Sequence, residues 1–265
     1  MSSVTSTSKE EWITAADGHE IFTKAWFAVG APVAAVVFVH GLGEHIVRYD
    51  HVFEEFNKAG FQVSAFDQRG FGQTGKKSKT LGSTGGSLVL NYDCIGPLRT
   101  KLSGIIASAP LVLASAPTRP YALTVGIAGL VSRILPSFQT NIALDSSFIS
   151  RDCEHVEKYN TDPLVHGYIT TKGVYDMLTN GKLLLTDRYK IITKDVPILI
   201  AHGTEDGLTD YKASKEFFDK IEVTDKEYKV YEGHFHELHN EPEAERKVVI
   251  DHYIQWIRAH LPKTA

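Results

Sequence analysis

Two loops in this sequence place glycine and chemically active side chains directly after runs of strand-forming residues. Residues 40–45, His-Gly-Leu-Gly-Glu-His, follow the apolar run 34–39. Glycines allow backbone N–H groups to face open space, where they can stabilise an oxyanion, although the same pattern also suits an ordinary tight turn. Residues 202–207, His-Gly-Thr-Glu-Asp-Gly, follow the apolar run 196–201. Reactive groups of open α/β sheets lie beyond the carboxyl ends of strands, so both loops are candidate sites.

Asp206 and His236 are the side chains that this arrangement selects. Asp206 lies in the second loop, and His236 follows the last strand-like run of the chain. A carboxylate can orient an imidazole and stabilise its charged form, and an imidazole can act as a general base near neutral pH. The alternative for Asp206 is a solvated acidic loop. The order carboxylate, then histidine, is the chain order of α/β-hydrolase triads.

Metal binding is the alternative for the histidine-rich loop. His234, His236 and His239 cluster with Glu237 and Glu241 in the sequence. Their spacing does not match the His-Glu-x-x-His motif, which places both histidines on one helical face. We therefore expect neither a metal nor another cofactor.

The elements that must position these groups alternate between strands and helices. The run 34–39 contains no polar residue, which is typical of a strand buried on both faces. Alternation of buried strands with helices predicts an α/β fold with a doubly wound, mostly parallel sheet. The expected strands are 11–16, 20–27, 34–39, 61–66, 103–108, 196–201 and 227–231, and the expected helices are 49–59, 211–221 and 242–260. Asp67 and Arg69, in the loop after the strand 61–66, are expected to form a structural ion pair rather than to act in catalysis.

The chain divides into four segments. Residues 1–10 are polar and are expected to be disordered, and residues 11–110 form the first part of the core. Residues 111–194 contain helical patterns broken by prolines, which predicts a helical cap above the sheet. Residues 195–265 form the second part of the core. Within the cap, the apolar segment 121–135 is either a buried helix or a lid that contacts lipid.

Composition limits the class of protein. The formal net charge is -4 and the sequence pI is about 6.3, which gives no electrostatic reason to bind nucleic acid. Two cysteines in 265 residues favour a reducing compartment, and no apolar stretch reaches the roughly 20 residues that span a bilayer. We expect a cytoplasmic protein, with peripheral contact to membranes or lipid droplets through the cap.

Six segments of the chain together form a family pattern: residues 40–45, 66–72, 108–113, 146–151, 159–164 and 231–239. In their joint order they resemble the monoglyceride lipase family, within the serine-aminopeptidase-like α/β-hydrolases. The resemblance implies that Asp206 is the triad acid, that His236 is the base, and that the N–H of Leu42 donates to the oxyanion. It also implies acyl transfer from a monoacylglycerol to serine and then to water, yielding fatty acid and glycerol, with lysophospholipids or other esters as alternative substrates.

The sequence departs from this family at the nucleophile. No serine lies in a Gly-x-Ser-x-Gly motif, which normally forms a strained turn between strand and helix. Residues 77–86 resemble the loop upstream of that turn and residues 85–92 resemble the helix after it, fused at a shared Gly-Gly. Ser83, with the N–H of Thr84, is a substitute candidate, but Leu81 replaces the first glycine of the motif. We favour an absent nucleophile.

About 30 residues, one helix and one central strand, are therefore expected to be missing. The two neighbouring strands must then pair directly or leave backbone groups unpaired, at roughly 1–3 kcal/mol for each buried group. A splice variant or an incorrectly assembled gene prediction would explain such a deletion. The functional alternative to an ester hydrolase is a catalytically dead protein that retains an acyl-binding pocket.

Overall fold

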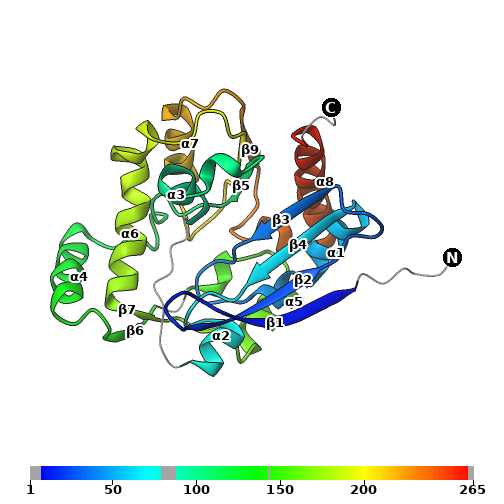
Figure 1. Cartoon of the computed structure of the whole chain (residues 1–265). Coiled ribbons are helices and arrows are strands. Elements are labelled where there is room, and N and C mark those ends of the chain that lie inside the picture. The colour runs from blue at the N-terminus through cyan, green and yellow to red at the C-terminus, as the bar shows by residue number, and fades with distance from the viewer. Residues whose placement is uncertain (1–6, 79–87, 143, 262–265) are drawn as a thin grey trace.

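The computed structural model describes residues 7–78, 88–142 and 144–261, and its strands form two separate main sheets (Figure 1). The first sheet has the order β1-β2-β4-β3, with β1 and β2 antiparallel and β3 parallel to β4. The second has the order β5-β8-β9 and is parallel throughout. The strands are β1 (Ser8–Thr14), β2 (Glu20–Trp26), β3 (Ala34–Phe38), β4 (Phe61–Phe66), β5 (Ile105–Ser108), β8 (Ile198–Gly203) and β9 (Lys226–Tyr231).

Helices connect and cover these sheets. The helices are α1 (Asp50–Lys58), α2 (Gly72–Lys77), α3 (Leu88–Ile95), α4 (Ala122–Ile134), α5 (Cys153–Thr161), α6 (Thr171–Thr186), α7 (Tyr211–Lys220) and α8 (Glu243–Ala259). Short 3-10 helices lie at Ile46–Tyr49, Arg99–Lys101, Ser146–Phe148, Arg188–Lys190 and Leu238–Asn240. The α/β class, the mostly parallel pairing and the helices near 49–59, 211–221 and 242–260 are thus confirmed.

Two core clusters hold the sheets. In the first, aromatic side chains of β2, β4 and α1 pack with Leu199 of β8 and with Tyr253 and Trp256 of α8. This cluster therefore joins the two sheets on one face. In the second, α3, α6 and α7 pack against β5 and β8, with Leu184 and Phe217 completely buried. Since Leu184 lies within the segment predicted as cap, α6 connects the cap to the core.

Strand β3 corrects one expectation. It pairs with β4 on one side, and no described strand pairs with its other side. Val37 is 69% exposed and Ala35 is exposed, so the strand is not buried on both faces. Strand β5 likewise pairs with β8 alone among the described strands. Two strands that an intact sheet would place inside it are therefore edges.

The sequences of the four edge strands differ in charge. The outer edges β1 and β9 carry charged side chains, Lys9, Glu10 and Glu11 in one and Lys226, Glu227 and Lys229 in the other. Strands β3 and β5 carry none. Charges on an edge strand discourage further strand pairing, so their absence indicates strands whose sequences suit the interior of a sheet.

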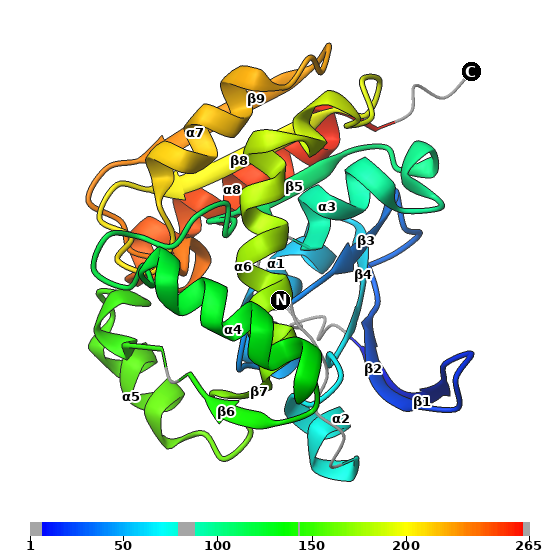
Figure 2. The ribbon, with the colours of Figure 1, turned by 90° about the vertical axis from the view of Figure 1, so that its left-hand side faces the viewer.

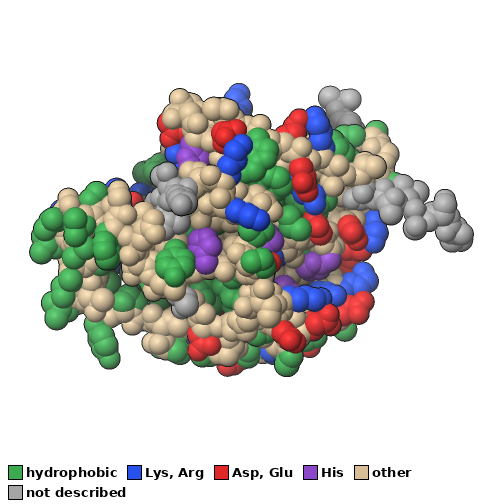
Figure 3. All heavy atoms as spheres, turned by 90° about the horizontal axis from the view of Figure 1, so that it is seen from below, with side chains coloured by type: hydrophobic (Ala, Val, Ile, Leu, Met, Phe, Trp, Pro, Cys, Tyr) green, Lys and Arg blue, Asp and Glu red, His purple; other side chains and the backbone are tan. Residues whose placement is uncertain are grey.

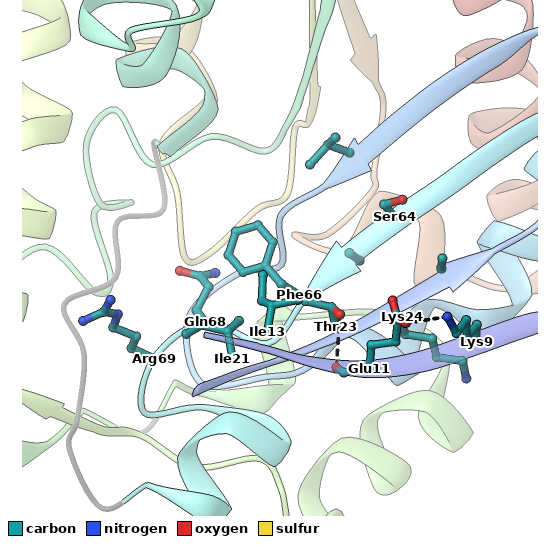
Figure 4. Close-up of a pocket in the computed structure, with 13 residues that line it drawn as sticks. Lys9, Glu11, Ile13, Ile21, Thr23, Lys24, Ser64, Phe66, Gln68 and Arg69 are labelled. Atoms are coloured by element: carbon teal, nitrogen blue, oxygen red, sulfur yellow. Dashed lines mark hydrogen bonds and ion pairs between the residues drawn. The ribbon is translucent and has the colours of Figure 1, made fainter. Parts of the chain in front are cut away.

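One face of the first sheet also has no helix over it in the described part of the chain. Phe22 and Val63 turn toward the shared core, whereas Thr23, Ser64 and Val37 border an open groove of about 560 Å³ on the other face (Figure 4). Strands in doubly wound sheets normally have helices on both faces. The bare face is the kind of surface that a further helix would cover, and the groove contains neither Asp206 nor His236.

The cap is mostly helical, as predicted, but it also contains a small sheet. Strands β6 (Gln139–Asn141) and β7 (Tyr168–Thr170) pair antiparallel below α4, and α4 packs along α6 (Figure 2). Gly129 allows this close approach, since a Cβ there would lie 2.7 Å from the ring of Tyr175. Among the described residues, no helix is long and apolar enough to cross a bilayer.

Two smaller expectations are wrong. Residues Ser8 to Glu10 are not disordered but begin β1, where they pair with Lys24 to Trp26. Asp67 and Arg69, expected to form an ion pair, have different partners. Asp67 accepts hydrogen bonds from the N–H groups of Ile46 and Gln73, whereas Arg69 pairs with Asp17 at 2.8 Å.

Candidate active site

The predicted acid and base meet in the structure. Asp206 follows β8 and His236 follows β9, and the two strands are parallel neighbours with Gly203 opposite Tyr231. His236 Nδ1 lies 2.8 Å from Asp206 Oδ2. The register of two adjacent strands therefore places the carboxylate against the imidazole, as the sequence predicted.

Close packing of the two loops depends on Gly203. A Cβ at this position would lie 2.2 Å from the carbonyl oxygen of His234, so any side chain would push the loops apart. Cross-loop hydrogen bonds from Thr204 N to Tyr231 O and from Glu205 N to His234 O, both 3.1 Å, complete the contact. The acid–base distance is thus set by the backbone.

Asp206 is held as an anion. Its side chain is completely buried, and Oδ1 accepts hydrogen bonds from the N–H groups of Leu208 at 2.8 Å and Thr209 at 2.9 Å. Oδ2 accepts a third from the hydroxyl of Thr209 at 2.6 Å. Burial alone would raise the pKa of Asp206, but the nearby imidazoles of His236 and His202 outweigh it and hold that pKa well below its usual value.

His236 is polarised by the same contact. Its burial opposes protonation, but the charge of Asp206 and the hydrogen bond to it raise the pKa of His236 to about 9, with smaller contributions from Glu237 and Glu44. The His236 side chain is 24% exposed, and Nε2 has no hydrogen-bond partner among the described residues. This nitrogen is therefore available to a hydroxyl nucleophile.

Backbone hydrogen bonds to the cap hold the loop that carries His236. The N–H of His236 donates to Phe148 O at 3.2 Å, and the N–H of Glu237 donates to Ile149 O at 2.7 Å. Glu237 in turn accepts two hydrogen bonds from Arg48, at 2.9 and 3.0 Å. Because Arg48 lies just after the loop of residues 40–45, the two loops share one buried ion-pair network.

Hydrogen bonds of the residues on either side of Leu42 hold the loop of residues 40–45 in place. The N–H of Gly41 donates to Glu44 Oε1 at 2.6 Å, and the N–H of His166 donates to Gly43 O at 2.9 Å. The N–H of Leu42 has no acceptor among the described residues, as an oxyanion donor requires. Sequence analysis did not foresee the contact with His166, which links two segments far apart in the chain.

Gly43 offers a test of this loop. It has a φ of +79°, and a Cβ there would lie 2.7 Å from the carbonyl oxygen of His166. Gly43→Ala should therefore lower the free energy of unfolding by about 2 kcal/mol or more. Gly126→Ala is the matched control, because it adds a methyl group to open space on helix α4 and should raise that free energy by roughly 0.5–1 kcal/mol. Urea unfolding measures the free energy of unfolding of both variants. If the two substitutions change it equally, the loop around Gly43 is not tightly packed against His166.

The other histidine-loop residues have separate partners. Glu241 pairs with Arg151 at 2.9 Å, and His239 is buried with its ring 5.0 Å from that of Tyr49. His234 lies 3.7 Å from Glu245. Within the described ranges, no three potential ligands converge on a point where a metal ion would fit.

Ser83 lies outside the described residues, as do Leu81 and Thr84. The proposed substitute nucleophile therefore stays a prediction. The described part of the site consists of the Asp206 carboxylate, the His236 imidazole and a loop in which the N–H of Leu42 has no described acceptor. The sequence analysis did not identify Thr209 and His202 as hydrogen-bond partners of Asp206. Both lie within four residues of Asp206 in the sequence, and this short spacing could have indicated them.

The chain matches the family described as "Serine aminopeptidase, S33" over residues 30–82 and 80–243. A putative monoglyceride lipase of Schizosaccharomyces pombe is 33% identical, over 91% of this chain and 72% of that protein. A monoacylglycerol lipase of Mycolicibacterium smegmatis is 30% identical, over 97% of this chain and all of that protein. The crystal structure of a soluble variant of the Saccharomyces cerevisiae monoglyceride lipase, with a substrate analogue, superposes with a TM-score of 0.85 at 25% identity, covering 97% of this chain and 98% of that one.

The family match is interrupted, and the alignment with the fission yeast relative is longer than the part of this chain that it covers. The two blocks of the family match meet at residues 80–82, beside the shared Gly-Gly. The fission yeast alignment has 274 positions but occupies 91% of a 265-residue chain, about 241 residues, so about 33 positions have no counterpart here. On either side of the interruption the family pattern continues over most of the sequence. The chain therefore belongs to the serine aminopeptidase S33 family and is an α/β-hydrolase of the monoglyceride-lipase type.

Proposed function

We propose that this chain carries a site for monoacylglycerols in which the acid, the base and one oxyanion donor are in place and the nucleophilic serine is missing. The observation that carries the proposal is the contact of 2.8 Å between Asp206 and His236 at the ends of adjacent parallel strands. In an intact site, His236 would take the proton of the serine hydroxyl as it attacks the ester carbonyl, and would return it to the glycerol leaving group. The N–H of Leu42 would donate to the oxyanion. Fatty acid and glycerol are the expected products, and relatives named as monoglyceride lipases support this choice of ester.

The present form of the chain then binds the lipid ester without turning it over. Two observations favour this over an active enzyme with Ser83 as its nucleophile. No Gly-x-Ser-x-Gly motif occurs in the sequence. In addition, no described strand pairs with the free edge of β3 or of β5, where the strand that supports such a turn would lie. A hydroxyl without a rigid turn is not held against the imidazole, and the triad depends on that geometry.

A fluorophosphonate probe separates the two possibilities. The probe bonds covalently only to an activated serine, so we expect the purified chain to remain unlabelled while it still binds a monoacylglycerol in equilibrium dialysis. Asp206→Asn is a useful comparison, because it should leave both results unchanged. Labelling of the chain that disappears in Ser83→Ala would show instead that the enzyme is active through Ser83. Failure to bind the lipid would contradict the assignment of the site.

We also propose that α4 contacts a lipid surface and lies over the acyl-chain entrance. Hydrophobic side chains gather at the end of the molecule that α4 occupies (Figure 3). Four of them follow one helical face, with exposures from 55% to 75%: Leu123, Ile127, Leu130 and Ile134. The helix is therefore not a buried cap helix, which was one of the two interpretations of its sequence. An exposed apolar stripe on a helix is typical of interfacial binding.

Substitutions on this stripe test the contact. The double variant Leu123→Ser with Ile127→Ser should weaken binding to phosphatidylcholine vesicles at least about tenfold, because two apolar side chains no longer enter the interface. Val248→Ser is the matched control, since Val248 is 59% exposed but lies on α8. Vesicle co-sedimentation measures the binding. If the control and the double variant bind equally, the stripe does not contact the membrane.

A further inference from the structure

A second imidazole contacts the acid of the site from inside the core. His202, near the end of β8, is completely buried, and its Nε2 lies 3.1 Å from Asp206 Oδ2. The same oxygen has His236 Nδ1 at 2.8 Å and the hydroxyl of Thr209 at 2.6 Å. Asp206 thus lies between one imidazole that faces the site and one that does not.

The groups around His202 determine where its ring carries a proton. Nε2 faces the carboxylate of Asp206 and lies 3.3 Å from the carbonyl oxygen of Thr209. Both groups only accept hydrogen bonds, so Nε2 must carry a hydrogen and donate it. In a neutral ring, Nδ1 is then an acceptor.

Ser214 of α7 is the donor that such an acceptor needs. It is completely buried, and its Oγ lies 2.7 Å from His202 Nδ1. The hydroxyl of Tyr228 lies 2.8 Å from Ser214 Oγ, but it also donates to Tyr211 O at 2.8 Å. Hydrogen bonds therefore run in one direction from Ser214 through His202 to Asp206.

A charged His202 is the alternative, in which Nδ1 donates to Ser214 and Ser214 donates to Tyr211 O at 2.9 Å. That state would put a second cation beside one buried carboxylate that already faces His236. Asp206 is the one anion among the described partners of His202, and because it also faces His236 it does not fully offset the desolvation penalty of a second buried cation. The neutral ring is therefore the better fit to these contacts.

We propose that His202 is a positioning residue for the acid–base pair: held as the Nε2–H tautomer by Ser214, it fixes Asp206 Oδ2 toward His236 and disperses part of the carboxylate charge. Its importance for catalysis rests on the proposed function. The hydrogen-bond pattern itself can be tested without any turnover.

Nitrogen-15 NMR of the histidine rings in the full-length chain provides this test. His202 should show a protonated Nε2 and an unprotonated Nδ1. In His202→Leu, Asp206 loses a donor and its charge acts more strongly on His236. The protonation constant of His236 should then rise about threefold, or about half a pH unit. Glu237 and Glu44, the other anions that act on His236, are unchanged in this variant.

Two further variants distinguish positioning from simple packing. His202→Gln retains an amide donor and should return the protonation constant of His236 most of the way to its original value. Ser214→Ala removes the donor to Nδ1 without touching Asp206, so Nε2 should stay protonated while the nitrogen-15 shift of Nδ1 changes because its hydrogen bond is lost. His252, which lies on α8 and is paired with Glu227 at 2.9 Å, is the internal reference, and its resonances should be the same in all variants.

The proposal is wrong if His236 titrates identically in the wild-type chain and His202→Leu, or if His202 carries its proton on Nδ1. Should His202→Leu fail to fold, Ser214→Ala decides the question: an Nδ1 shift that does not change in that variant would show that Ser214 does not donate to His202. A chain that binds no monoacylglycerol but shows these NMR changes would contradict the proposed function alone. Lipid binding without the changes would contradict the role of His202 alone.

Discussion

Covalent labelling by a fluorophosphonate should appear when the missing segment is restored. The change is insertion, at the shared Gly-Gly, of the roughly 30 residues of a strand, nucleophile turn and helix that the family pattern has there. The inserted strand would pair with the free edges of β3 and β5, and the turn after it would hold a serine beside His236 Nε2. Asp206 and His236 are already 2.8 Å apart, so no other part of the acid–base pair has to be built.

The expected gain is large because the triad acts as a unit. Removing a triad serine typically costs roughly a millionfold in kcat, so hydrolysis of a monoacylglycerol by the restored chain should exceed that of the present chain at least about a thousandfold. The control is the same insertion with alanine in place of its serine, which restores the sheet but leaves the chain unlabelled. Ser83→Ala in the restored chain should change nothing. If the restored chain folds but stays inactive, the site has lost more than its nucleophile.

Self-association through the open edges is the second large effect that we expect. Strands β3 and β5 each have one side without a partner among the described strands, and neither carries a charge to discourage pairing. An exposed, uncharged edge is a template for pairing with another chain. We therefore expect the purified protein to form dimers and larger species at micromolar concentrations.

Val37→Lys should move this equilibrium toward the monomer, because it places a charge in the middle of β3 at a side chain that is 69% exposed. Val230→Lys is the matched control. Val230 is 37% exposed on β9, an edge strand that already carries Lys226, Glu227 and Lys229. Sedimentation velocity over a concentration series distinguishes the two variants. A wild-type chain that is monomeric at all concentrations would mean that the edges of β3 and β5 are covered.

Much of this structure was predictable because it depends on local patterns. Alternating and continuous apolar runs located β2, β4 and β8 to within two residues of their ends, and glycine-bounded loops located the Asp206–His236 pair. Both signals lie within short stretches of sequence. The chain order of acid and base then fixed which loops had to meet.

The errors share a different cause, since each depends on a distant part of the chain. Burial of β3 requires a neighbour on each side, and the neighbouring strand is lacking on one of them. Arg69 pairs with Asp17, which lies 52 residues away, rather than with nearby Asp67. His202 resembled an ordinary strand residue until α7 brought Ser214 to it. Partners of this kind are set by tertiary packing, which periodicity does not report.

The shared core on one face has a mechanical consequence. Helices α1 and α8 pack against strands of both sheets on that face, and their side chains join the two sheets. Leu42 follows β3 of the first sheet, whereas Asp206 and His236 follow β8 and β9 of the second sheet. The distance between the N–H of Leu42 and the ring of His236 therefore depends on the packing of α1 and α8 between the sheets. If that packing is disrupted, no substitution within one sheet alone can restore the distance.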